Sequence, residues 1–262
     1  MAVAVARRYE RLTWSVALLV AAVCWLLTIR ATREMAGGMP MPGGWTMSMG
    51  WMVMPGQSIL AAAAMFLTMW TVMMVAMMLP SVLPVVLLYR GLAAARRARQ
   101  VSIAPEAVLL AGYFVVWAAF GLVAFGIGLW FAGLTMQHDA VSRAVPLLSG
   151  AVLILAGVYQ VTPLKRVCLR HCRSPVSFFT SGWREGWLGT FRLGVHHGSY
   201  CAACCWALMA IQLVVGVMNL WMMAAIAGAI AVEKSWRHGE RFAIAFGIGV
   251  MIAGAIQLTS VL

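Results

Sequence analysis

The amino-acid sequence predicts an all-α fold, a polytopic transmembrane helical bundle of about seven spans with a cytoplasmic N-terminus. Composition is the first observation behind this prediction. The 262 residues are 63% hydrophobic with a mean hydropathy of +0.91, and only 10% are charged, whereas soluble proteins carry about 25% charged residues. The second is that apolar residues form runs close to the roughly 20 residues that a helix needs to cross a bilayer. We therefore expect a single integral membrane domain over residues 1–262, with the lipid bilayer as its surroundings.

The apolar runs place the spans in order along the chain. The run at 58–88 is longer than one straight span, and we expect Pro80 and Pro84 to kink or end its helix. The run at 197–232 is too long for one span, and we expect a break between Gly216 and Asn219. The seven spans are predicted at 12–29, 58–88, 107–131, 144–162, 197–217, 219–232 and 242–262.

The basic residues predict the orientation. With the N-terminus in the cytoplasm, all of the 19 Lys and Arg except Arg30, Arg33 and Arg143 fall in cytoplasmic segments, as the positive-inside rule requires. Because these residues lie between the spans and form no single patch, the net charge of +12 reflects topology, and we expect no nucleic-acid partner. The predicted location is the bacterial inner membrane, crossed several times.

Two groups of cysteine and histidine are the main candidates for chemistry. The first group is Cys168, His171 and Cys172, and the second is His196, His197, Cys201, Cys204 and Cys205. Helix positions four apart share a face, so His197, Cys201 and Cys205 form one stripe. A single cysteine often packs as a small apolar residue, but three within five residues, following two histidines, indicate a metal or redox site.

The predicted topology brings these two groups together. One follows the fourth span and the other begins the fifth, and a cytoplasmic Cys/His loop over residues 163–196 joins them. We therefore expect one shared site or two neighbouring sites. The cytosol keeps thiols reduced, which disfavours disulfides. Thiolates combined with thioethers favour Cu(I), while thiolates with imidazoles also suit zinc, and iron remains an alternative.

Methionine is the second signal. An external loop over residues 30–57 is rich in methionine, and its Gly and Pro residues oppose a regular helix. In the second span, methionines step by four along one helical line, with another line beside it. Packing between helices explains such a stripe, and a thioether route for a soft metal toward the thiols is the alternative. The candidate residues are Met65, Met69, Met73, Met77 and Met78.

Several other polar residues lie near the predicted cytoplasmic ends of the spans. We expect Glu233 and Lys234 to form an interfacial ion pair with each other. Tyr159, Gln160 and Thr162 end the fourth span, where they serve either as donors near the metal site or as ordinary interfacial residues.

Three stretches of the chain carry a resemblance to a known family. MMVAMMLPS (73–81), YQVTPLKRVCLRHCRSP (159–175) and HHGSYCAACCWALM (196–209) resemble a bacterial family of uncharacterised, predicted metal-binding integral membrane proteins. The similarity extends from the second span to about Lys234 and departs from the family at Ala203, where glycine is common. The resemblance implies metal binding and leaves the metal and any reaction open.

The function we expect is a metal-binding integral membrane protein that handles Cu(I), by transport or by delivery to a membrane cuproenzyme. Its partner would be that cuproenzyme or a metallochaperone. One alternative is a membrane thiol-redox or zinc- or iron-dependent enzyme, and another is a structural subunit of a larger membrane complex. The sequence has no nucleophile elbow, phosphate-binding glycine loop or paired carboxylates, which disfavours a hydrolase or an ATP-driven pump.

Overall fold

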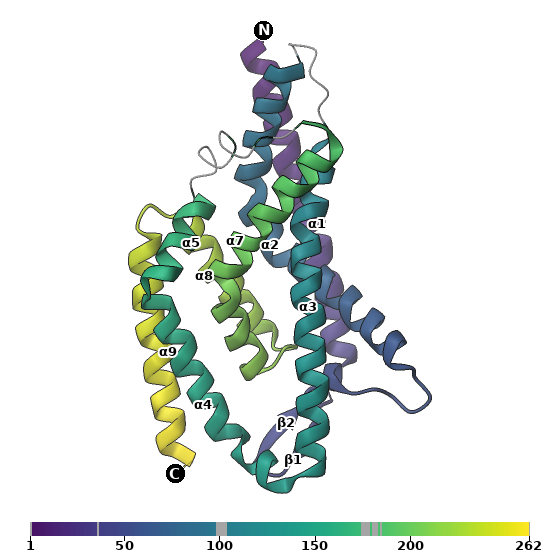
Figure 1. The fold of residues 1–262 in the computed structure, drawn as a ribbon, viewed down its shortest axis with the longest axis vertical. Coiled ribbons are helices and arrows are strands. Elements are labelled where there is room, and N and C mark those ends of the chain that lie inside the picture. The colour runs from purple at the N-terminus through teal and green to yellow at the C-terminus, as the bar shows by residue number, and fades with distance from the viewer. Residues whose placement is uncertain are drawn as a thin grey trace.

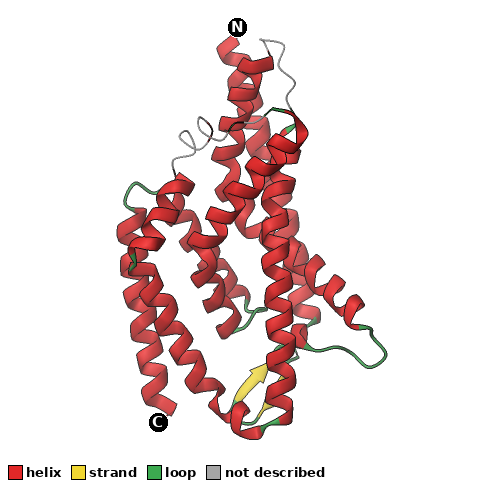
Figure 2. Cartoon of the chain, viewed as in Figure 1, coloured by secondary structure: helices red, strands yellow, loops and turns green. Residues whose placement is uncertain are grey.

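Helices make up nearly all of the described chain in the computed structural model, and one short hairpin supplies its strands (Figures 1 and 2). The structure describes residues 2–35, 37–97, 104–173, 179, 183 and 185–261. The helices are α1 (Ala2–Glu34), α2 (Ile59–Arg97), α3 (Glu106–Gln137), α4 (Asp139–Val161), α5 (Pro163–Arg173), α7 (Gly186–Val215), α8 (Leu220–Ser235) and α9 (Gly239–Val261). The all-α helical bundle predicted from the sequence is confirmed.

Each of the seven predicted spans overlaps a helix. Six of the described helices are long and apolar enough to cross a membrane by themselves: α1, α2, α3, α4, α7 and α9. The seventh predicted span is α8, whose 16 residues extend about 24 Å, less than the roughly 30 Å of a bilayer core, and which returns the chain between α7 and α9. The break before α8 lies where predicted, since Gly216 has a φ of 124° and the Asn219 side chain accepts a hydrogen bond from the Met222 amide at 3.1 Å.

Helix α2 passes through both of its prolines. Pro80 and Pro84 lie inside one continuous helix of 39 residues, so neither proline ends it. In a membrane bundle, neighbouring helices and hydroxyl side chains compensate the backbone groups that proline frees. Ser81, beside Pro80, donates to the Met78 carbonyl at 2.9 Å.

The predicted cytoplasmic loop at 163–196 is wrong over much of its length. Its first part is helix α5, and α7 already begins at Gly186. Pro163 suits the first position of a helix, and the Thr162 hydroxyl caps α5 by accepting from the Lys165 amide at 3.3 Å. Residues 174–178, 180–182 and 184 of this segment lie outside the described residues, as do 98–103, so the structure places neither Arg99 nor Arg184.

The predicted external loop contains an ordered hairpin. Strands β1 (Met39–Met41) and β2 (Trp45–Met47) pair antiparallel, and a 3-10 turn, η1 (Met49–Trp51), follows. Gly43 and Gly44 turn the chain with φ values of 101° and 76°. The Trp45 indole donates to the Ser142 carbonyl at 2.9 Å, which attaches the hairpin to α4. The first residues of the predicted loop, 30–34, belong to α1, and no α-helix occurs over the described residues 37–58.

The central element of the bundle is the hairpin of α7 and α8. Figure 1 shows this hairpin between α1, α2 and α3 on one side and α4 and α9 on the other, with the two termini at opposite ends. Glycines allow the close helix contacts that hold it: a Cβ at Gly194 of α7 would lie 2.0 Å from the Leu109 carbonyl oxygen of α3. Helix α7 therefore lies in the interior, where it carries three of the candidate cysteines.

Candidate metal centre

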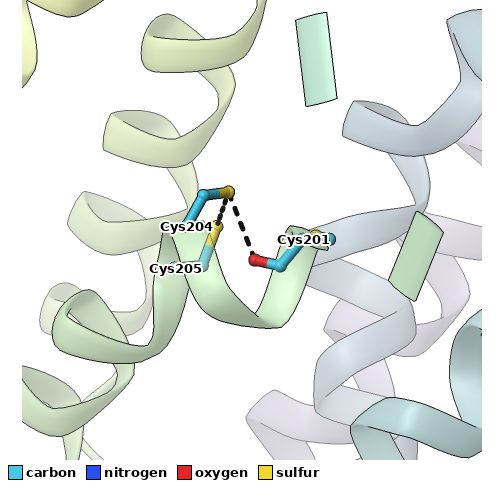
Figure 3. Close-up of side chains that lie close together, drawn as sticks. All are labelled: Cys201, Cys204 and Cys205. Atoms are coloured by element: carbon cyan, nitrogen blue, oxygen red, sulfur yellow. Dashed lines mark hydrogen bonds between the residues drawn. The ribbon is translucent and has the colours of Figure 1, made fainter. Parts of the chain in front are cut away.

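Three sulfurs of α7 lie together in the interior of the bundle. Cys201, Cys204 and Cys205 are fully buried, and their Sγ atoms all lie within 4.8 Å of one another. The Cys204 and Cys205 Sγ atoms are 3.3 Å apart, and the Cys204 thiol donates to the Cys201 carbonyl oxygen at 3.2 Å (Figure 3). The spacing of three and four residues places these side chains on neighbouring parts of one helix face.

Helix α5 adds a fourth sulfur to this group. The Sγ of Cys172 lies 3.7 Å from that of Cys204, and the Cys172 side chain is buried. Thiolates that bind one tetrahedral metal ion at about 2.3 Å have sulfurs about 3.8 Å apart. The structure thus brings the two sequence clusters together through Cys172. We call Cys172, Cys201, Cys204 and Cys205 the thiol centre.

Two side chains from other helices contact one sulfur of the thiol centre. The Lys234 ammonium, near the end of α8, donates to the Cys201 Sγ at 2.9 Å, and the Tyr113 hydroxyl of α3 lies 2.9 Å from the same atom. Lys234 also contacts the Ser81 hydroxyl of α2 at 3.3 Å. A neighbouring positive charge favours a thiolate over a thiol, and the thiolate is the form that binds metals.

A buried ion pair flanks the thiol centre. Lys165 Nζ lies 2.7 Å from the Glu233 carboxylate, and both side chains are almost completely inaccessible. Lys165 also donates to the Cys204 carbonyl at 2.6 Å, and the Gln160 amide donates to Glu233 at 3.3 Å. The predicted interfacial pair between Glu233 and Lys234 is therefore wrong. Adjacent residues of a helix do not face each other, and these two side chains reach different partners.

None of the three candidate histidines belongs to the group of converging ligand atoms in the described part of the chain. His171 is half-buried and stacks on Tyr200 with ring centroids 4.0 Å apart, and its centroid is 6.2 Å from that of the exposed His196. His197 is buried and stacks against Tyr113 at 5.8 Å.

Cys168 also lies apart from the group of sulfurs on α7. It is buried one turn before Cys172 on α5. Within the described part of the chain, Cys201, Cys204 and Cys205 form the only set of three Cys, His, Asp or Glu side chains whose ligand atoms converge closely enough for one ion.

The methionine line of α2 runs from the surface into the interior. Met65 is 57% exposed, Met69 is partly buried, and Met73, Met77 and Met78 are at most 3% exposed. One turn beyond Met77 lies Ser81, whose hydroxyl contacts Lys234. The line therefore ends beside the side chain that donates to Cys201.

The sequence reasoning missed Tyr113, Ser81 and Lys165. Lys165 carried a usable signal, because it shares one face of a short helix with Cys168, Leu169 and Cys172, all buried. A positive charge on that face predicts a buried partner. For Tyr113, the signal was a hydroxyl within an otherwise apolar span. Tyr159 and Gln160, predicted as possible donors, do reach this region: the Tyr159 hydroxyl donates to the Ala203 carbonyl at 2.6 Å.

Comparison with known proteins adds one finding. The model of the PpoB2 family, described as a copper chaperone, matches residues 67–257 and so includes every helix that contributes to the thiol centre. Neither the curated proteins nor the solved structures gave a significant match.

Proposed function

We propose that this chain, which belongs to the PpoB2 copper chaperone family, binds Cu(I) at the thiol centre and delivers it to a copper enzyme of the membrane. The observation that carries the proposal is the convergence of buried sulfurs from α5 and α7, with Cys172 3.7 Å from Cys204. Thiolates are soft ligands, which suit Cu(I). They also bind zinc, so the choice of copper rests on the family and on the methionine line.

The charges around the sulfurs support metal binding. Two or three thiolates around one Cu(I) carry a net negative charge, which is costly in a low-dielectric interior. The Lys234 ammonium, 2.9 Å from the Cys201 sulfur, offsets part of that charge. Lys165 and Glu233 neutralise each other. The half-exposed imidazole of His171, beside Cys172, and the exposed His196 are suitable ligands for passing the ion to a partner.

Metal analysis of protein purified from copper-supplemented cells tests this proposal. We expect the wild-type protein to retain copper through washing with a chelator, whereas Cys201→Ser/Cys205→Ser loses most of it, because two of the three grouped sulfurs of α7 are gone. Cys24→Ser is the matched control, since Cys24 lies in α1 outside the thiol centre, and it should retain copper. Equal copper in the wild type and the double variant, or zinc alone in the wild type, would refute the proposal.

A thiol-redox enzyme is the second candidate, because the contact of Lys234 with Cys201 also describes a reactive thiolate. Anaerobic thiol titration separates the two functions. Thiols that become unreactive when Cu(I) is added, with no reversible two-electron disulfide couple, indicate a copper site. A reversible disulfide in the native protein would favour the redox enzyme instead.

The proposed orientation places the N-terminus in the cytoplasm and the C-terminus outside. Two observations support it: with this orientation all Lys and Arg except Arg30, Arg33 and Arg143 fall in cytoplasmic segments, and the two termini lie at opposite ends of the bundle (Figure 1). A reporter enzyme that is active only outside the cytoplasm should therefore be active when fused after Leu262 and inactive when fused at the N-terminus. The reverse pattern, or both fusions active, would overturn the orientation.

A further inference from the structure

A second group of sulfur ligands lines a cavity that includes no residue of the thiol centre. The cavity has a volume of about 450 Å³ and lies where α1 ends and α2 begins. Five methionines line it: Met35, Met49, Met52, Met65 and Met69. The thiol centre lies between other elements, with sulfurs from α5 and α7 and a contact from the end of α8. We call this cavity the methionine pocket.

The methionine pocket is assembled from three separate segments. Met35 follows the end of α1, Met49 and Met52 belong to the segment around η1, and Met65 and Met69 are one turn apart on α2. Methionines that merely fill gaps between helices pack closely against their neighbours. Here the five side chains border a cavity instead, which leaves room for a ligand beside their thioethers.

The lining indicates what kind of ligand the pocket accepts. Thioether sulfurs are soft, neutral ligands that select Cu(I) over harder ions such as Mg²⁺ or Ca²⁺. The same cavity is lined by the carboxylate-bearing residue Glu34, which would partly balance the charge of a bound monovalent cation. The remaining lining is mostly apolar, including Phe66 and Phe125, and so disfavours a strongly hydrated ion.

Its position links the methionine pocket to the line of methionines on α2. Met69 lines the pocket, and Met73 and Met77 follow at intervals of four residues, about 6 Å along a helix. Both are buried, and the next residue of this line, Ser81, contacts Lys234 beside the thiol centre. Four of the five pocket methionines precede residue 67, where the family match begins, so most of the pocket's sulfur ligands lie outside the matched region.

We propose that the methionine pocket is a second Cu(I) site, which captures the ion at this end of the bundle and supplies it along α2. The proposed capture of Cu(I) depends only on the residues that line the pocket. The proposed supply of Cu(I) to the thiol centre also rests on the function proposed above. Binding at the pocket is therefore tested in protein that lacks the thiol centre.

The test is an anaerobic titration of the purified full-length protein with Cu(I), using bicinchoninate as the competing chelator. The variant with Cys172, Cys201, Cys204 and Cys205 all replaced by serine should still bind one Cu(I) per chain. Adding Met49→Leu/Met52→Leu/Met65→Leu should weaken this binding by about tenfold or more, equivalent to about 1.4 kcal/mol. The matched control, Met39→Leu/Met54→Leu/Met136→Leu, changes exposed methionines outside the pocket and should leave the affinity unchanged.

Two outcomes would overturn the methionine pocket: a serine variant that folds but binds no Cu(I), or equal weakening by the pocket and control substitutions. If the serine variant does not fold, selenomethionine-labelled wild-type protein decides instead. Selenium-edge X-ray absorption after addition of two Cu(I) per chain should show copper in the selenium coordination shell, and its absence would refute the site. If the wild-type protein retains no copper after washing with a chelator, that result refutes the proposed thiol centre and does not bear on the methionine pocket.

Discussion

Replacing Lys165 with methionine is expected to destabilise the folded protein by about 3–5 kcal/mol, because it leaves one member of a buried ion pair without its partner. In the wild type, Lys165 Nζ lies 2.7 Å from the Glu233 carboxylate, and the two side chains are 0% and 1% exposed. In Lys165→Met, the Gln160 amide at 3.3 Å is the hydrogen-bond donor that remains to that carboxylate among the described residues. Denaturant unfolding in detergent measures the loss.

Two further variants make this expectation specific. Lys165→Met/Glu233→Leu removes both charges and should recover most of the lost stability, since apolar replacement of a whole buried pair is often neutral. Arg170→Met, on the same helix, breaks the pair with Glu240, in which the Arg170 side chain is 66% exposed. Surface pairs contribute at most about 1 kcal/mol. A loss for Lys165→Met no larger than that for Arg170→Met would show that the buried pair is not important for stability.

The helices could be predicted from the sequence because the bilayer restricts the choices. A chain in lipid must satisfy its backbone hydrogen bonds internally, so a long apolar run predicts a helix by itself. Helix α5 has only 11 residues and many polar ones, and it was predicted as loop for that reason. Its basic residues were interpreted as topology signals, although Lys165 points into the bundle.

The candidate site was predictable only as far as contacts are local. The spacing of Cys201, Cys204 and Cys205 follows helical periodicity, and the structure places these sulfurs together. The partners of Cys201 come from elsewhere, since Tyr113 is 88 residues and Lys234 is 33 residues away along the chain. Contacts at such separations depend on how the helices pack, and the close approach at Gly194 that sets the distance between α3 and α7 is not visible in a periodic pattern.

The contact between Lys234 and Cys201 gives the second large expected effect. Lys234→Leu should weaken Cu(I) binding by about 10- to 100-fold, the usual cost of removing a side chain that orients or polarises a metal ligand. The physical reason is charge: the ammonium at 2.9 Å from the Cys201 sulfur stabilises the thiolate and offsets the negative charge of the loaded centre. Competition with a Cu(I) chelator measures the affinity.

Conservative variants then separate charge from hydrogen bonding at the same sulfur. Lys234→Arg keeps the positive charge and should retain most of the Cu(I) affinity. Lys234→Gln keeps only a hydrogen-bond donor, so its Cu(I) affinity should be close to that of Lys234→Leu. Tyr113→Phe removes the hydrogen bond at 2.9 Å but leaves the ammonium in place, and it should cost less than Lys234→Leu, because an uncharged hydroxyl offsets none of the negative charge of the loaded centre. If Lys234→Leu bound Cu(I) as tightly as the wild type while remaining folded, the charge of Lys234 would have no part in holding the ion, and its contact with Cys201 would serve packing alone.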